Sequence, residues 1–79
     1  MTRRTKLDSM EDAARQIEVE YPTVSATVKQ VRFGRRPAEW ALVIEGPTRH
    51  ESTSYMTFTM RQFSVLGVDR VLEDASRIA

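Results

Sequence analysis

Apolar residues in the first part of the chain recur at helical spacing. The positions that fall on one face of such a helix are Met10, Ala13, Ala14, Ile17 and Tyr21. Asp8 with Glu11, or Ser9 with Asp12, has the spacing of an N-terminal capping box. Pro22 ends the helix, because the residue before a proline disfavours helical backbone angles. The pattern predicts an amphipathic helix up to Tyr21, although its C-terminal residues also alternate as in a strand.

Three segments with strand-like alternation follow, at residues 23–33, 38–45 and 52–60. Their main apolar positions are Val24, Ala26 and Val28, then Ala38, Trp40, Leu42 and Ile44, then Met56, Phe58 and Met60. In the first segment the apolar parity switches at Val31 and Phe33, which predicts a β-bulge or a bend. The sequence Gly34-Arg35-Arg36-Pro37 is typical of a turn, and Gly46-Pro47 opens a second loop that runs through Glu51.

A second helix is expected near the C-terminus, after a connector at residues 61–67 that ends in Gly67. Its apolar face would consist of Val68, Val71, Leu72, Ala75 and Ile78. Asp69 near its start and Arg77 near its end have the charges that the helix dipole favours.

These elements predict a single α+β domain in α-β-β-β-α order. The short loops favour a three-stranded antiparallel meander, with both helices packed on one face. Trp40 is expected in the core on that face. The other face is expected to be open to water, with Tyr55, Val43 and Ala41 at its middle. Residues 1–6 are predicted to be a basic, flexible N-terminal tail, and residues 7–79 to form the domain.

The composition excludes several classes of structure and site. The chain has 79 residues and no cysteine, which excludes disulfides and thiolate metal sites and leaves core packing to provide a stability of roughly 3–5 kcal/mol. No uninterrupted apolar stretch, including the one that contains Ala41 to Ile44, approaches the length needed to cross a membrane. No apolar signal-peptide core follows the basic N-terminus. We therefore expect a cytoplasmic protein, preferably of a bacterium or a phage, without membrane contact.

Charge is segregated along the chain although the net charge is only +1. Acidic residues dominate residues 7–21, whereas residues 22–36 contain only basic charges, at Lys29, Arg32, Arg35 and Arg36. A tight turn at Pro22 makes the first helix and first strand antiparallel. This topology would bring the basic tail, with Arg3, Arg4 and Lys6, to the same pole as Arg35 and Arg36.

Candidate chemistry is sparse. His50, the only histidine, lies in a polar loop, where a solvated side chain is more common than an acid–base catalyst. No nucleotide-binding, hydrolase or zinc motif is present, so we expect no enzyme activity, no cofactor and no metal. Glu11 and Asp12 could grip a basic partner or serve capping and solubility, and Tyr55 could stack on a base or simply favour a strand.

The α-β-β-β-α order resembles that of the double-stranded RNA-binding domain and of small toxins with the same fold. The string Gly46-Pro47-Thr48-Arg49-His50 is similar to the family's Gly-Pro-x-His motif, with one extra residue and a place before the third predicted strand rather than the second. The predicted second helix starts Val68-Asp69-Arg70, without the family's lysine cluster. The resemblance lies in the order of the elements, and it implies nucleic-acid binding as one alternative.

Two functions remain as hypotheses. The first is a small non-catalytic protein that occupies a surface of a larger protein or nucleoprotein partner, as an inhibitor or adaptor of the phage anti-defence type. The second is a nucleic-acid-binding module whose basic pole contacts phosphates. The protein would be a monomer or a homodimer. The candidate partner-binding residues are Arg35, Arg36, Lys29, Arg32, Arg3, Arg4, Tyr55, Glu11 and Asp12.

Overall fold

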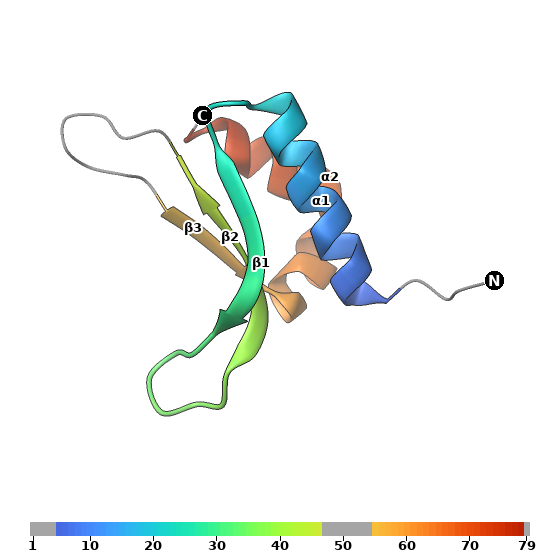
Figure 1. Ribbon diagram of the computed structural model, residues 1–79. Helices are drawn as coiled ribbons and strands as arrows, with labels where there is room; N and C mark the ends of the chain where they lie inside the picture. Colours follow the sequence, from blue (N-terminus) through green and yellow to red (C-terminus); the bar gives the residue numbers. More distant parts are fainter. Residues whose placement is uncertain (1–4, 47–54, 79) are drawn as a thin grey trace.

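The computed structural model describes residues 5–46 and 55–78. The elements are α1 (Lys6–Glu20), β1 (Ser25–Val31), β2 (Glu39–Glu45), β3 (Tyr55–Thr59) and α2 (Met60–Ser76). The strands form one antiparallel sheet in the order β1-β2-β3. Both helices lie on the same side of the sheet (Figure 1). The predicted α+β meander with two helices on one face is thus confirmed.

Helix α1 begins earlier than the sequence pattern predicts. Thr5 is its N-cap, and the capping box joins Thr5 to Asp8 rather than Asp8 to Glu11 or Ser9 to Asp12. The Thr5 hydroxyl accepts a hydrogen bond from Asp8 N at 3.1 Å, and Asp8 Oδ2 accepts one from Thr5 N at 3.2 Å. Thr5 and Lys6, which the sequence assigned to the tail, therefore belong to the start of the helix. The tail residues 1–4 lie outside the described residues.

Helix α2 also begins earlier, at Met60, so the connector predicted at residues 61–67 is mostly helical. Thr59 is the N-cap: its hydroxyl accepts from Gln62 N at 3.2 Å, while Gln62 Oε1 accepts from Thr59 N at 2.9 Å. The helix is interrupted at Gly67, whose φ of 83° and ψ of 166° are not helical. The break separates a first segment, Met60 to Leu66, from the segment that the sequence predicted.

Thr59→Ala should destabilise the protein by about 1 kcal/mol, because it removes the side chain that satisfies a free N–H group at the start of α2. Thr57→Ala is the matched control, since Thr57 is exposed on the same strand and caps no helix. Urea unfolding followed by circular dichroism measures both. Equal losses for the two variants would contradict a capping role for Thr59.

The core lies between the sheet and the two helices. Its helical contributors include the predicted Met10 and Ile17 of α1 and Val71 and Ala75 of α2, each at most 1% exposed. Phe63 of α2 is also in the core, although the sequence pattern assigned it to the connector. Leu42 and Ile44 of β2 are fully buried beneath them. The register of β1 on β2 runs without offset from Ser25↔Glu45 to Val31↔Glu39, so the predicted β-bulge is absent from this ladder.

Two predictions of burial were wrong. Ala41 and Val43, expected on an open face, are 0% and 6% exposed. They sit on the central strand, where a strand on each side covers them: Lys29 and Thr59 are the cross-strand neighbours of Ala41, and Thr27 and Thr57 are those of Val43. Trp40, expected in the core, is 39% exposed. It precedes Ala41, at which the ladder between β2 and β3 ends, so β3 does not flank it.

Candidate functional site

A two-stranded ribbon projects from one end of the sheet. The ladder between β2 and β3 stops at Ala41↔Thr59, whereas β1 and β2 stay paired as far as Val31↔Glu39. Residues 32–40 are all exposed. We call residues 29–40 the hairpin end; its connection projects beyond the rest of the sheet in Figure 1.

A tight turn forms the tip of the hairpin end. Arg36 N donates to Phe33 O at 3.2 Å, which closes a four-residue turn over Gly34 and Arg35. Gly34 takes a φ of 62°, in the left-handed region that residues with a side chain disfavour. The turn predicted at Gly34-Arg35-Arg36-Pro37 is confirmed at this place. It sets Arg35 at the outer part of the ribbon, and Arg36 follows on the side that returns to β2.

The arginines of the described chain fall into two groups. The first group is ion-paired with acids of the helices: Arg15 pairs with Asp12 of α1, and Arg70 and Arg77 pair with Asp74 of α2, at N···O distances of 3.3 Å and 3.8 Å. The second group makes no ion pair with any acid in the described residues, and it consists of Arg32, Arg35, Arg36 and Arg61. The unpaired guanidinium groups are thus free to bind an anionic partner.

A shallow cleft of about 260 Å³ lies at the base of the hairpin end. It is lined by Arg36, Glu39, Thr59, Arg61 and Gln62. The end of β3 and the start of α2 meet the start of β2 here, because β3 runs antiparallel to β2. The lining carries two positive charges and one negative charge, and its size lies below the range of most small-molecule pockets. The cleft therefore suits a small charged group better than an apolar ligand.

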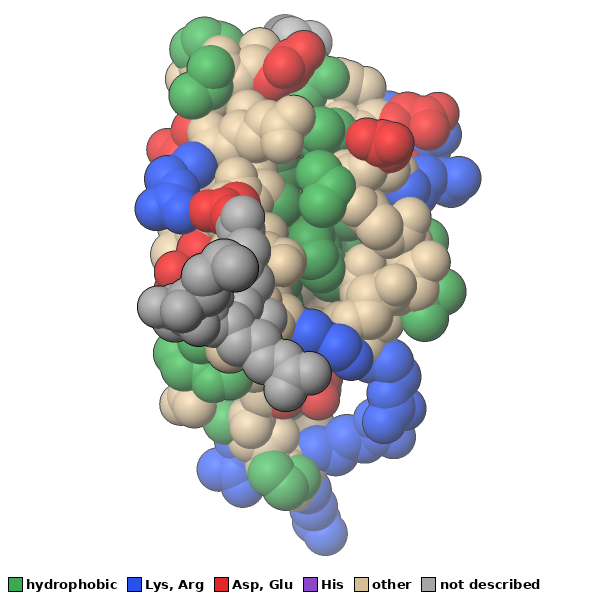
Figure 2. All heavy atoms as spheres, turned by 90° about the vertical axis from the view of Figure 1, so that its right-hand side faces the viewer, with side chains coloured by type: hydrophobic (Ala, Val, Ile, Leu, Met, Phe, Trp, Pro, Cys, Tyr) green, Lys and Arg blue, Asp and Glu red, His purple; other side chains and the backbone are tan. Residues whose placement is uncertain are grey.

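Exposed aromatic residues accompany these charges. Phe33, within the turn, is 42% exposed, and Trp40, at the start of the paired ribbon, is 39% exposed. Aromatic residues and arginine are the residue types enriched at the centres of binding interfaces. In Figure 2 the largest group of blue Lys and Arg side chains lies toward the lower end of the face shown, and smaller blue groups lie beside red ones higher up. The hairpin end thus combines projection, unpaired positive charge and exposed aromatic surface.

The structure brings some of the predicted partner-binding residues together. Arg32, Arg35 and Arg36 lie in the hairpin end, and Lys29 lies at its base, exposed and paired in register with Ala41. Tyr55 is 66% exposed but pairs with Glu45, at the opposite end of the sheet, so it does not join them.

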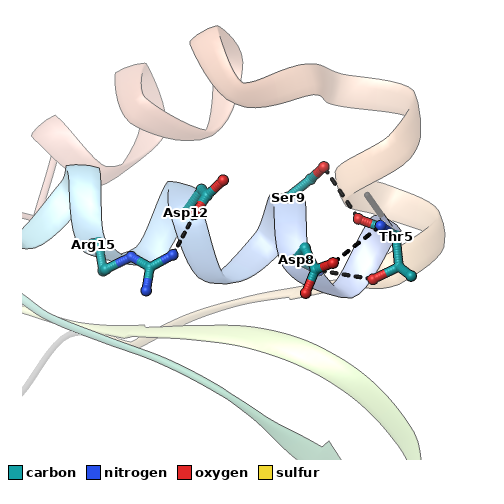
Figure 3. Close-up of polar contacts among 5 residues, drawn as sticks. All are labelled: Thr5, Asp8, Ser9, Asp12 and Arg15. Carbon is teal, nitrogen blue, oxygen red and sulfur yellow. Dashed lines mark hydrogen bonds and ion pairs between the residues drawn. The ribbon is translucent and has the colours of Figure 1, made fainter. Parts of the chain in front are cut away.

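The acidic helix has mainly internal partners for its first acids. Asp8 belongs to the capping box, and Asp12 accepts a hydrogen bond from Arg15 (Figure 3). Glu11 is exposed, with no hydrogen bond or ion pair to a described residue. The contacts of Asp8 and Asp12 agree with the capping and solubility role that the sequence left open beside partner binding.

The predicted basic pole is described only in part. α1 and β1 run in opposite directions, so α1 begins toward the end at which β1 continues into the hairpin (Figure 1). Lys6, the first residue of α1, is exposed there. Arg3, Arg4 and His50 lie outside the described residues.

Sequence reasoning missed Arg61 as a member of the site. It was assigned to a connector, whereas it is the second residue of α2 and lines the cleft beside Arg36. Two features of the sequence could have placed Arg61 in the site. The Thr-x-x-Gln pattern at Thr59 and Gln62 is a capping box that starts a helix. A third strand antiparallel to the second must also end on the side of the sheet where the hairpin lies.

Within residues 5–46 and 55–78, neither helix is long and apolar enough to span a lipid bilayer. In the same residues no group of three or more His, Asp or Glu side chains is placed to hold a metal ion.

Comparison of the chain with protein-family models, with curated proteins and with solved structures finds no match in any of the three.

Proposed function

We propose that this is a small non-catalytic binding protein that acts by occupying a surface of a larger protein or nucleoprotein partner, as an inhibitor or adaptor. The observation that carries the proposal is the separation of the arginines. Arg15, Arg70 and Arg77 are ion-paired within the fold, while the arginines of the hairpin end and Arg61 make no ion pair with a described acid. Unpaired guanidinium groups at one projecting end favour contact with an acidic surface.

The shape of the site supports a macromolecular partner. The hairpin end projects with every residue from 32 to 40 exposed, whereas small ligands are usually bound in concave, largely apolar pockets. A projecting ribbon instead fits into a groove or cleft of something larger. Phe33 and Trp40 would supply apolar contact area between the charges.

A second candidate function is a nucleic-acid-binding module that contacts phosphates through the same surface. The observation that favours it is the chemistry of the unpaired groups. All four are guanidinium groups, which match the geometry of a phosphate through two parallel hydrogen bonds. Under this alternative the order of elements shared with double-stranded RNA-binding domains would also have a functional meaning.

The double variant Arg35→Gln/Arg36→Gln should lose the partner while keeping the fold, because both side chains are exposed at the tip and make no described ion pair. Affinity capture from a bacterial lysate, with and without nuclease, measures this. Arg15→Gln is the matched control, since it removes a charge from α1, away from the hairpin.

The expected result is a partner retained by the wild type and by Arg15→Gln but lost from the double variant. Retention after nuclease treatment supports a protein surface as the contact. Recovery of nucleic acid alone, lost with nuclease, supports the second candidate. Equal capture by all three proteins, or capture of nothing by the wild type, contradicts both.

A further inference from the structure

The hairpin end has the dimensions of a groove-binding ribbon. Two residue pairs, Gln30↔Trp40 and Val31↔Glu39, continue the β1–β2 ladder beyond its neighbour β3, and a loop at residues 32–38 follows them. At about 3.3 Å per residue the two pairs extend the ribbon by ~7 Å beyond the three-stranded sheet, and the loop carries its tip farther out (Figure 1). The major groove of B-form DNA is ~8.5 Å deep and ~12 Å wide, and it admits a two-stranded β-ribbon.

The charges on the hairpin end suit a duplex. Glu39 is the only acid among residues 29–40, and it lies at the base of the ribbon, where it lines the cleft together with Arg36 and Arg61. The tip carries no acid at all. An anionic groove would therefore meet only positive and apolar side chains until the ribbon is fully inserted. Guanidinium groups also bind guanine O6 and N7 in the major groove.

We propose that the β1–β2 hairpin enters the major groove of B-form DNA, which would be the part of a nucleoprotein partner that this protein contacts; the inference rests on the proposed function. Arg35, at the tip, reaches the base edges. Arg32, with Arg36 and Arg61, which line the cleft closer to the sheet, binds phosphates at the rim of the groove. Phe33 contacts the floor, where thymine methyl groups accept apolar side chains.

Duplex RNA distinguishes insertion into a groove from attraction by charge alone. Its A-form major groove is deep and narrow, so side chains cannot read it, although its phosphates carry the same charge. A surface that recognised charge alone would bind both duplexes with similar affinity. Insertion of the ribbon instead requires the wider groove of DNA.

The first test is fluorescence anisotropy with a labelled 20-base-pair DNA duplex and an RNA duplex of the same sequence. We expect DNA to bind at least 10-fold more tightly. With about four phosphate or base contacts, the DNA affinity should fall ~100-fold between 50 and 200 mM salt. Arg35→Gln/Arg36→Gln should lower the affinity by at least 10-fold at the lower salt concentration and flatten the salt dependence, whereas Arg15→Gln should leave both within about two-fold.

The second test locates the ribbon. Dimethyl sulfate methylates guanine N7 in the major groove and adenine N3 in the minor groove. Bound wild-type protein should protect guanine N7, and the double variant should not. Equal affinity for the two duplexes, protection confined to adenine N3, or absence of DNA binding at low salt would each overturn the proposal.

The two proposals fail differently. If the hairpin variant loses a nuclease-resistant protein partner in the capture experiment while the wild type binds no DNA duplex, the proposed function stands and the groove inference is wrong. If wild type, double variant and Arg15→Gln behave alike in both experiments, the hairpin end is not the binding surface and both proposals are wrong.

Discussion

Leu42→Ala is expected to unfold a large fraction of the protein at room temperature. Leu42 is fully buried, on the central strand, with Val28 and Phe58 as its cross-strand partners. Its removal costs the transfer free energy of the side chain plus that of the cavity, about 3–4 kcal/mol. The whole domain is expected to have a free energy of unfolding of only roughly 3–5 kcal/mol, so truncation of Leu42 removes most of it.

Urea unfolding followed by circular dichroism measures this effect. Val19→Ala is the matched control, because Val19 is 81% exposed and its truncation should change the stability by less than about 0.5 kcal/mol. If Leu42→Ala lost less than about 1 kcal/mol, the core between the sheet and the helices would not be the main source of stability. The surface contacts would then have to be reconsidered as stabilising elements.

The core of the fold could be predicted from the sequence because the buried residues of α1 and of the second half of α2 recur at helical spacing. The stripe of Met10, Ala13, Ala14 and Ile17 is buried as expected, and Val71 and Ala75 complete it from α2. Helical and strand periods differ, so these side chains could face the core only in the predicted elements. Short connections then left few topologies for the sheet.

The start of α2 could not be read from apolar period alone. Met56, Phe58 and Met60 alternate as in a strand, and this pattern continues past the residue at which the helix begins. The capping box of Thr59 and Gln62 decides the boundary, because both backbone N–H groups gain partners when the chain turns into a helix. Local hydrogen bonding overrode the apolar pattern here.

The candidate site was predictable as a run of charge but not as a surface. The sequence shows Lys29, Arg32, Arg35 and Arg36 without an intervening acid. Whether an arginine is paired depends on neighbours in space, as Arg61 shows by lining the cleft with Arg36 from a different element. The exposure of Trp40 likewise depends on the tertiary structure, because β2 extends beyond its ladder with β3 at this residue.

Gly67→Ala is expected to destabilise the protein by about 2 kcal/mol, by a mechanism different from loss of packing. With φ at 83° and ψ at 166°, Gly67 occupies a backbone region that is essentially restricted to glycine. A Cβ at this position would meet no atom within 4 Å, so the cost arises from the backbone and not from a steric clash. The break lets α2 change direction between Phe63 and Val71, which are both buried in the core.

Alanine at position 67 leaves the chain two alternatives. It retains the break and bears the backbone strain, or it straightens α2 and withdraws Phe63 or Val71 from the core. Both lower the free energy of unfolding, and amide hydrogen exchange separates them, because only straightening would protect the amides next to residue 67. Val65→Ala, at a residue 80% exposed in the same helix, is the control and should be close to neutral. A Gly67→Ala variant as stable as this control would mean that the two halves of α2 pack on the sheet without needing the break. The cap at Thr59 alone would then hold Arg61 beside the base of the hairpin end.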